Sequence, residues 1–211
     1  MEILSPIFKG LMQLTGVLSI GLLLTLSFLD SDVKGGITNI KLVKKTKVFL
    51  LAWLLATFAF ILIQISYLLQ QPLASSFDLT VIRSYLTQTA IGKSYIVQII
   101  GIIILLSIAL RRVITTYLCL LIGLIAIVAP VFQSHGSSSG RHGLAIGALV
   151  IHVIALSFWV GGLFGLTQLN KEQKLIALPR FSELALWSAI TVVITGAATA
   201  WTRLDSIEAW Q

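Results

Sequence analysis

The sequence predicts an all-α protein, a polytopic transmembrane helix bundle. Of its 211 residues, 57% are hydrophobic and 11% are charged, and the mean hydropathy is +0.98. Soluble domains carry about 25% charged residues. A helix needs about 20 mostly apolar residues to cross a hydrocarbon core roughly 30 Å thick. The chain contains about six such runs, so we expect one transmembrane domain over residues 1–211.

The apolar runs give the expected helices in chain order. They lie near 10–29, 48–69, 94–110, 113–132, 143–168 and 181–203. The first run has no basic segment before it and no small-residue cleavage pattern after it, so we expect a retained helix and not a signal peptide. The semi-polar stretch 83–93, which precedes the third run, is suited to a short interfacial helix.

Basic residues are concentrated in alternate connections between these runs. They are Lys34, Lys41, Lys44, Lys45 and Lys47 in the first, Arg111 and Arg112 in the third, and Lys171, Lys174 and Arg180 in the fifth. Because cytoplasmic loops carry an excess of Lys and Arg, we expect these connections to face the cytoplasm and both termini to face the periplasmic side. The net charge of +7 then reflects topology. No nucleic-acid motif accompanies it, and no nucleic-acid partner is expected.

All three histidines, His135, His142 and His152, fall within 18 residues. Histidine is the commonest metal ligand, and ionisable groups at membrane depth need a partner. On one helix, His142 and His152 are about 15 Å apart along the axis and about 80° apart in direction, so one ion cannot contact both. The flexible 136–140 linker allows His135 to meet His142. We predict an outer pair and a separate inner histidine. The simpler alternatives are a solvated loop for the pair and a hydrogen-bonded core imidazole for His152.

Other reactive side chains are few. Cys119, the single cysteine, lies about 24 Å along the fourth run from His135 and is expected to be a packed core thiol. The only methionines are Met1 and Met12, which disfavours a soft-ligand copper relay. No nucleophile stands beside a histidine in a recognisable catalytic spacing, so we expect no enzyme activity.

Small and aromatic residues follow His152. Trp159 is seven residues on, which places it on nearly the same face of an ideal helix, where it would line a cavity wall or simply pack. Gly161 and Gly162 remove two side chains and would allow another helix backbone to approach closely.

The sixth run has a second small-residue face at Thr195 and Gly196. The Thr195 hydroxyl would bond back to its own helix or reach His152 at a similar depth. Arg180 and Ser182 stand at the inner mouth, where Ser182 or Glu183 would cap the start of the sixth helix or pair with the arginine.

These residues, taken in order, carry a resemblance to a known family. The stretch from His152 through Ser157-Phe158-Trp159-Val160-Gly161-Gly162, then Arg180-Phe181-Ser182 and Thr195-Gly196 with Trp201 and Arg203, resembles the core signature of the copper resistance protein D family. Ser134-His135-Gly136 is similar to that family's outer-loop histidine. The resemblance covers residues 135–203 and is faint before them, at Thr89–Gly92.

The resemblance implies a multi-pass protein of the bacterial inner membrane that imports copper or serves copper resistance. It implies that His135, His142 and His152 bind the copper ion. Family members usually continue through two further helices, and many carry a fused periplasmic copper-binding domain. This sequence has six runs and no such fused domain, so the resemblance implies a separate periplasmic copper-binding protein as partner.

Two other hypotheses stay open. A membrane electron-transfer protein would hold haem through His152, although an axial pair at that depth needs a second deep histidine. Haem held by one histidine, or by His142 with His135 near the surface, is the form of this hypothesis that stays open. A membrane scaffold for cuproprotein assembly would bind copper without moving it.

Overall fold

The computed structural model describes residues 4–29, 39–108, 113–133 and 142–208. Within these ranges every regular element is helical. The elements are α1 (Leu4–Leu24) with the π turn η1 (Thr25–Leu29), α2 (Ile40–Leu69), the 3-10 turn η2 (Leu73–Phe77), α3 (Leu79–Gln88), α4 (Ala90–Ser107), α5 (Val113–Val128) with the 3-10 turn η3 (Ala129–Gln133), α6 (His142–Leu156) with the π turn η4 (Ser157–Gly161), α7 (Gly162–Thr167) and α8 (Lys171–Glu208).

Six helical segments in the described chain are long and apolar enough to span a membrane, as predicted. They are Leu4–Leu29, Ile40–Leu69, Ala90–Ser107, Thr115–Phe132, Ile146–Thr167 and Lys171–Trp201. The second and sixth begin earlier than the apolar runs at 48 and 181. Lysine and arginine are good helix formers whose long side chains reach the polar edge while the backbone stays helical. Charge therefore ends the apolar run without ending the helix.

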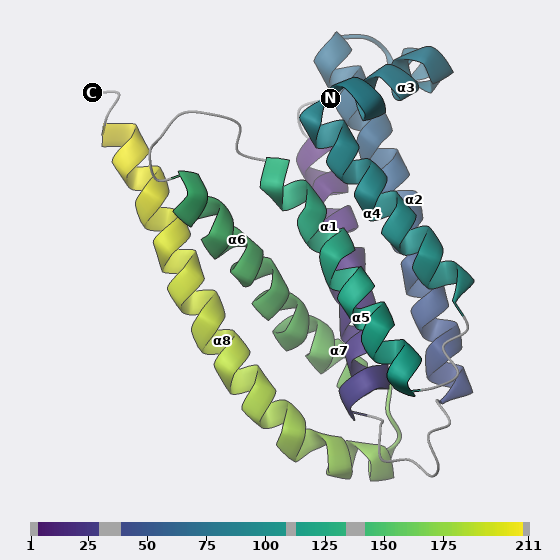
Figure 1. The fold of residues 1–211 in the computed structure, drawn as a ribbon, viewed down its shortest axis with the longest axis vertical. Helices are drawn as coiled ribbons and strands as arrows, with labels where there is room; N and C mark the ends of the chain where they lie inside the picture. Colours follow the sequence, from purple (N-terminus) through teal and green to yellow (C-terminus); the bar gives the residue numbers. More distant parts are fainter. Residues whose placement is uncertain (1–3, 30–38, 109–112, 134–141, 209–211) are drawn as a thin grey trace.

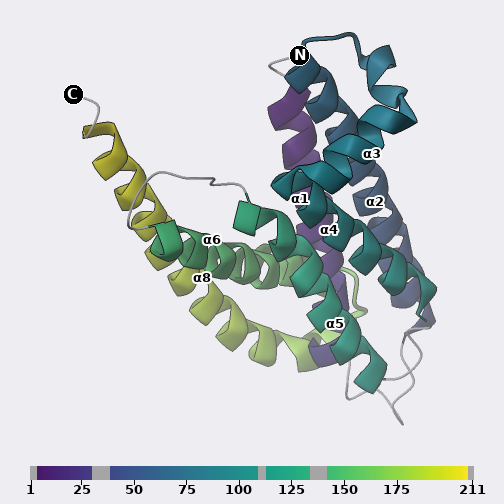
Figure 2. The same ribbon diagram turned by 45° about the horizontal axis from the view of Figure 1, so that its top comes forward.

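The helices form two groups that are visible in both ribbon views. α1, α2, α4 and α5 pack together, while α6 lies along α8 (Figures 1 and 2). α1 is the central helix: 67% of an apolar 18-residue window of its span is buried inside the protein, against 11% of the corresponding window of α8. Leu22, Leu23, Trp53 and Ile102 form the centre of the apolar core. Cys119 is also fully buried, so the expected core thiol is confirmed.

Glycines join the two groups where α1 crosses η4 and α7. A Cβ atom added to Gly21 would overlap the carbonyl of Gly161, and one added to Gly161 would overlap the carbonyl of Val17. A Cβ on Gly165 would overlap the Thr25 hydroxyl, and one on Gly162 would lie 2.6 Å from the ring of Phe181. The close backbone approach predicted for the glycine pair is confirmed at Gly161, where the partner is α1. At Gly162 the neighbour is instead a side chain, the ring of Phe181 on α8.

A short helix precedes the third span, as expected, but at 79–88 and not at 83–93. Asp78 begins α3 because its carboxylate accepts from the backbone N–H of Thr80 at 2.7 Å. Thr89 separates α3 from α4, since its hydroxyl accepts from the backbone N–H of Gly92 at 2.9 Å. The extended Thr89 backbone turns the chain from the short helix into the membrane span.

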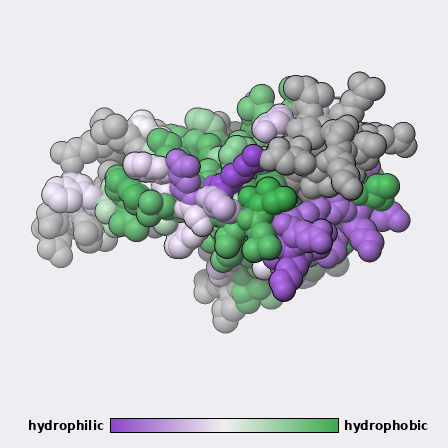
Figure 3. Space-filling model, turned by 90° about the horizontal axis from the view of Figure 1, so that it is seen from below, coloured by the Kyte–Doolittle hydropathy of each residue, from purple (hydrophilic) through white to green (hydrophobic). Residues whose placement is uncertain are grey.

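Hydrophilic side chains gather at the end of the molecule where α2 and α8 begin (Figure 3). The exposed basic residues of these two starts are Lys41, Lys44, Lys45, Lys171, Lys174 and Arg180. Lys45 Nζ donates to Gln168 Oε1 at 2.8 Å, and Lys47 Nζ donates to the Leu106 carbonyl at 2.9 Å. The start of α1 and the end of α8 lie at the opposite end (Figure 1). The basic starts of α2 and α8 thus share one side, while the assignment of that side to the cytoplasm stays a prediction.

α8 begins at Lys171, so the prediction that Ser182 or Glu183 caps its start is wrong. The cap is a reciprocal pair: Asn170 Oδ1 accepts from the Gln173 N–H at 2.8 Å, and Gln173 Oε1 accepts from the Asn170 N–H at 3.1 Å. Pro179 lies inside α8, where a missing N–H bends a helix without ending it. The lower part of α8 is curved in Figure 1.

Candidate functional site

The interface between α6 and α8 brings His152 to Thr195. His152 Nδ1 lies 3.1 Å from Thr195 Oγ1. Of the two alternatives predicted for the Thr195 hydroxyl, the structure thus shows the contact with His152, and it also shows the bond back to its own helix. His152 is half-buried and Thr195 is 8% exposed. A polar pair in this position satisfies itself across two helices, as buried polar groups in a membrane must.

The hydrogen bonds of Thr195 determine which imidazole nitrogen carries the proton. Thr195 Oγ1 is 2.6 Å from the Thr191 carbonyl, which can only accept, so the single hydroxyl hydrogen is donated there. The oxygen then accepts from His152, which requires a hydrogen on Nδ1. Neutral His152 accordingly has its lone pair on Nε2. Thr195 thus fixes the tautomer and ring orientation that a metal ligand needs, in the way that hydrogen-bond partners of ligating histidines do.

Gly196 lies beside the same ring. A Cβ atom at this position would be 3.6 Å from His152 Cε1 and 3.9 Å from Nδ1, which is ordinary van der Waals contact. The imidazole therefore lies against the α8 backbone, and an alanine would fit there. Gly196 contributes helix packing, without the steric requirement seen at Gly161.

The outer histidines are less completely described. His135 lies outside the described residues, and of His142 only the backbone is described, as the first residue of α6. Because α6 is continuous from His142 to Leu156, His142 and His152 are about 15 Å apart along its axis. The separation of an outer from an inner position follows from that rise. In the described part of the chain, no three His, Cys, Asp or Glu side chains are grouped to hold a metal ion.

Trp159 lies inside the π turn η4. A π turn adds a residue to the helical turn, so a seven-residue spacing across it no longer returns to the same face. The Trp159 side chain is 38% exposed. Its role as a cavity wall beside His152 stays a prediction.

Arg180 and Ser182 belong to the other end of α8. Fifteen residues, or about 22 Å of helix, separate Arg180 from Thr195. Both Arg180 and Ser182 are exposed near the basic starts of α2 and α8. They and His152 thus lie at different depths.

Two residues of this region were not singled out from the sequence. Thr191, which takes the Thr195 proton, stands four residues before it, and the i−4 back-bonding habit of threonine would have identified it. Gly21 on α1 is the partner of Gly161, and no spacing rule connects residues on helices so far apart in the chain.

The fold and this interface define a multi-pass helical membrane protein with a tautomer-fixed histidine between two of its spans. Residues 2–145 match the family model described as Copper resistance protein D-like, N-terminal domain. The match covers more than half of the chain, and the chain belongs to this family. No curated protein and no solved structure matches it.

The matched range lies in a different part of the chain from most of the residues that carry the sequence resemblance. It contains His135 and His142 and ends before His152. The family assignment is confirmed, and its support covers the first 145 residues, including Thr89–Gly92, where the resemblance was faint. Membership of the family associates the chain with copper resistance. It does not identify the residues that bind the metal.

Proposed function

We propose that this protein carries copper across the bacterial cytoplasmic membrane, in the import direction, as part of copper homeostasis or resistance. The observation that carries the proposal is the His152–Thr195 hydrogen bond between two membrane-spanning helices. An ionisable side chain at membrane depth is expensive and usually marks a path for an ion or a proton. The family supplies the identity of the ion, copper.

His152 Nε2 is the proposed inner ligand. Imidazole nitrogen suits copper, and Nε2 is the nitrogen whose lone pair the Thr195 contact leaves available. His135 and His142 are the proposed outer ligands, which receive copper from a separate periplasmic copper-binding protein. The rise of α6 then divides the path into an outer step at His142 and an inner step at His152. Copper in this scheme is the cargo.

The first experiment measures cellular copper by elemental analysis in bacteria that express the chain at matched membrane levels. We expect the intact chain to raise cellular copper, and His152→Ala and the His135→Ala/His142→Ala pair to abolish the rise. Unchanged copper with the intact chain, or a full rise in both variants, would contradict the proposal.

A second experiment isolates the role of Thr195. Thr195→Val removes the acceptor for His152 Nδ1 and should weaken copper binding about 10- to 100-fold, the usual effect of losing such a partner. Thr195→Ser keeps the hydroxyl and should restore binding. The matched control is Thr191→Val, which removes a hydroxyl one turn away but keeps the carbonyl that accepts from Thr195. Equal copper affinity in Thr195→Val and Thr191→Val would show that the contact only packs the helices.

The scaffold and haem hypotheses give different results in the purified protein. A scaffold binds copper in detergent yet admits none into sealed proteoliposomes. A haem protein has a visible absorption band that His152→Ala removes. In the described spans, His152 is the one histidine at mid-depth, which favours copper over a pair of axial haem ligands.

A further inference from the structure

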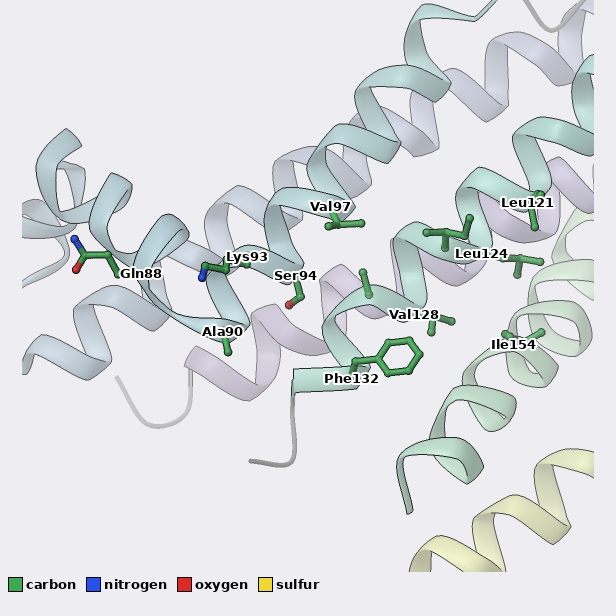
Figure 4. A pocket seen from close by; sticks show the side chains of 12 residues that line it. Gln88, Ala90, Lys93, Ser94, Val97, Leu121, Leu124, Val128, Phe132 and Ile154 are labelled. Atoms are coloured by element: carbon green, nitrogen blue, oxygen red, sulfur yellow. The ribbon is translucent and has the colours of Figure 1, made fainter. Parts of the chain in front are cut away.

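A lateral groove lies between the two helix groups and plays no part in the proposed copper path. It encloses about 880 Å³ between α4, α5 with η3, and α6. Most of the side chains that line it are apolar. Figure 4 shows Lys93 and Ser94 on α4, the row from Leu121 to Phe132 along α5 and η3, and Ile154 across from them on α6.

The long wall of the groove is apolar and open at the side. Val97, Leu121, Ile125 and Phe132 are 46%, 56%, 54% and 54% exposed. These residues belong to membrane-spanning segments, so the groove opens toward lipid. From Leu121 to Val128 the wall follows about 11 Å of helix rise, along the direction in which lipid chains run.

The polar groups of the groove are confined to one end. Gln88, Lys93 and Ser94 lie at the end of α3 and the first turns of α4. The Ser94 hydroxyl donates its hydrogen to the Ile91 carbonyl at 2.6 Å, which leaves the Lys93 ammonium and the Gln88 amide as donors toward a ligand. Lys93 is exposed, and the described part of the chain provides no ion pair for it. An uncompensated ammonium repels a copper cation and attracts an anion.

We propose that this groove binds one anionic phospholipid, with an acyl chain along α5 and the headgroup phosphate on Lys93. A basic side chain at the membrane surface attracts anionic lipid. The apolar side chains of the groove lie next to Lys93 and can contact an acyl chain. A pocket of this volume lies within the range of small-ligand sites. The bound lipid fills the space between α5 and α6, because α6 packs chiefly against α8.

The test uses the full chain in phosphatidylcholine vesicles that contain a phosphatidylglycerol bearing a photoreactive diazirine on its acyl chain. After illumination, labelled positions are located by peptide mass spectrometry. We expect residues 121–132 of α5 and η3 to be labelled more strongly than Val193 and Ile194, which are 70% and 62% exposed on α8. Diazirine-bearing phosphatidylcholine should label both regions equally.

Two variants separate the headgroup from the acyl chain. Lys93→Gln should lower phosphatidylglycerol labelling of the groove about fivefold, the effect of one basic residue near the surface. Lys9→Gln is the matched control, because Lys9 is an exposed lysine on the outer half of α1 away from the groove. Val97→Trp fills the apolar wall, keeps Lys93, and should also lower labelling.

Protection of the buried Cys119 thiol from a thiol-reactive dye verifies that each variant is folded. Labelling of the groove equal to that of α8, or full labelling in Lys93→Gln, would overturn the proposal and identify the lipid as ordinary bilayer lipid. The outcome is independent of copper transport, since none of the described residues that line the groove is a histidine.

Discussion

Replacing Gly161 with alanine should destabilise the protein by wedging apart the two helix groups. The added methyl would overlap the Val17 carbonyl and lie 3.0 Å from both Cα and N of Gly21, where carbon atoms normally pack at about 3.5–4.0 Å. The obstructing atoms are backbone and cannot rotate away. Overpacking of this kind costs about 1–3 kcal/mol, and we expect the upper half of that range.

The chain offers its own control in Gly147→Ala on α6. Nothing lies within 4 Å of a Cβ atom at Gly147. Alanine is a better helix former than glycine by up to about 1 kcal/mol, so Gly147→Ala should leave stability unchanged or raise it. The two variants make the same chemical change about four turns apart in one membrane segment and should shift stability in opposite directions.

The assay is thermal unfolding in detergent, followed with a dye that fluoresces on reacting with a thiol. The single cysteine, Cys119, is buried and becomes accessible when the helices separate. For a chain of this size, about 2 kcal/mol corresponds to a fall in Tm of about 4–8 °C. Equal Tm values for Gly161→Ala and Gly147→Ala would refute the assignment of a tight crossing to Gly161.

Three further changes test contacts elsewhere. Thr57→Val should lower the free energy of unfolding by about 1–2 kcal/mol, because the buried Gln98 amide, which donates to Thr57 Oγ1 at 2.8 Å, loses its acceptor. The double variant with Gln98→Leu should recover most of that loss. Asn170→Ala should cost about 1 kcal/mol through the lost α8 cap, and an unchanged Tm would contradict that role. Burial raises the pKa of Tyr85 to about 12 from 10.0, so the unfolded chain releases this proton first and stability falls as pH rises from about 10 to 12. Tyr85→Phe should flatten that fall, and it should add about 1 kcal/mol at neutral pH because the buried hydroxyl has no partner in the described chain. Identical pH profiles for the two proteins would exclude this assignment.

The number and order of the spans could be predicted because hydropathy is a local property of the chain. Six apolar runs became six spanning segments. Helix starts could not be placed in this way, since the beginnings of α2 and α8 are helical but charged. The start of α8 at Lys171 is determined by the Asn170–Gln173 cap, and it lies ten residues before the apolar run that begins at 181.

The inner part of the candidate site was predictable in outline. Helix rise placed His152 and Thr195 at similar depths, and the structure joins them. Which imidazole nitrogen of His152 carries the hydrogen depends on the 2.6 Å bond from Thr195 to the Thr191 carbonyl. That bond length could not be derived from the sequence. The groove beside Lys93 could not be foreseen, because its walls come from three different helices, and periodicity describes single helices.

The glycine crossing lies at one end of α6, so the crossing angle determines where the other end of α6 lies. α6 meets α1 through η4 at one end, and His142 is at the other, about 22 Å along the helix. A tilt of about 10° at the crossing would move His142 by about 4 Å, twice the length of a bond from histidine to a metal such as zinc. Phe132, in η3, belongs to the other group of helices. The separation of His142 from η3 therefore depends on the angle at which α1 crosses η4, about 22 Å away along the helix.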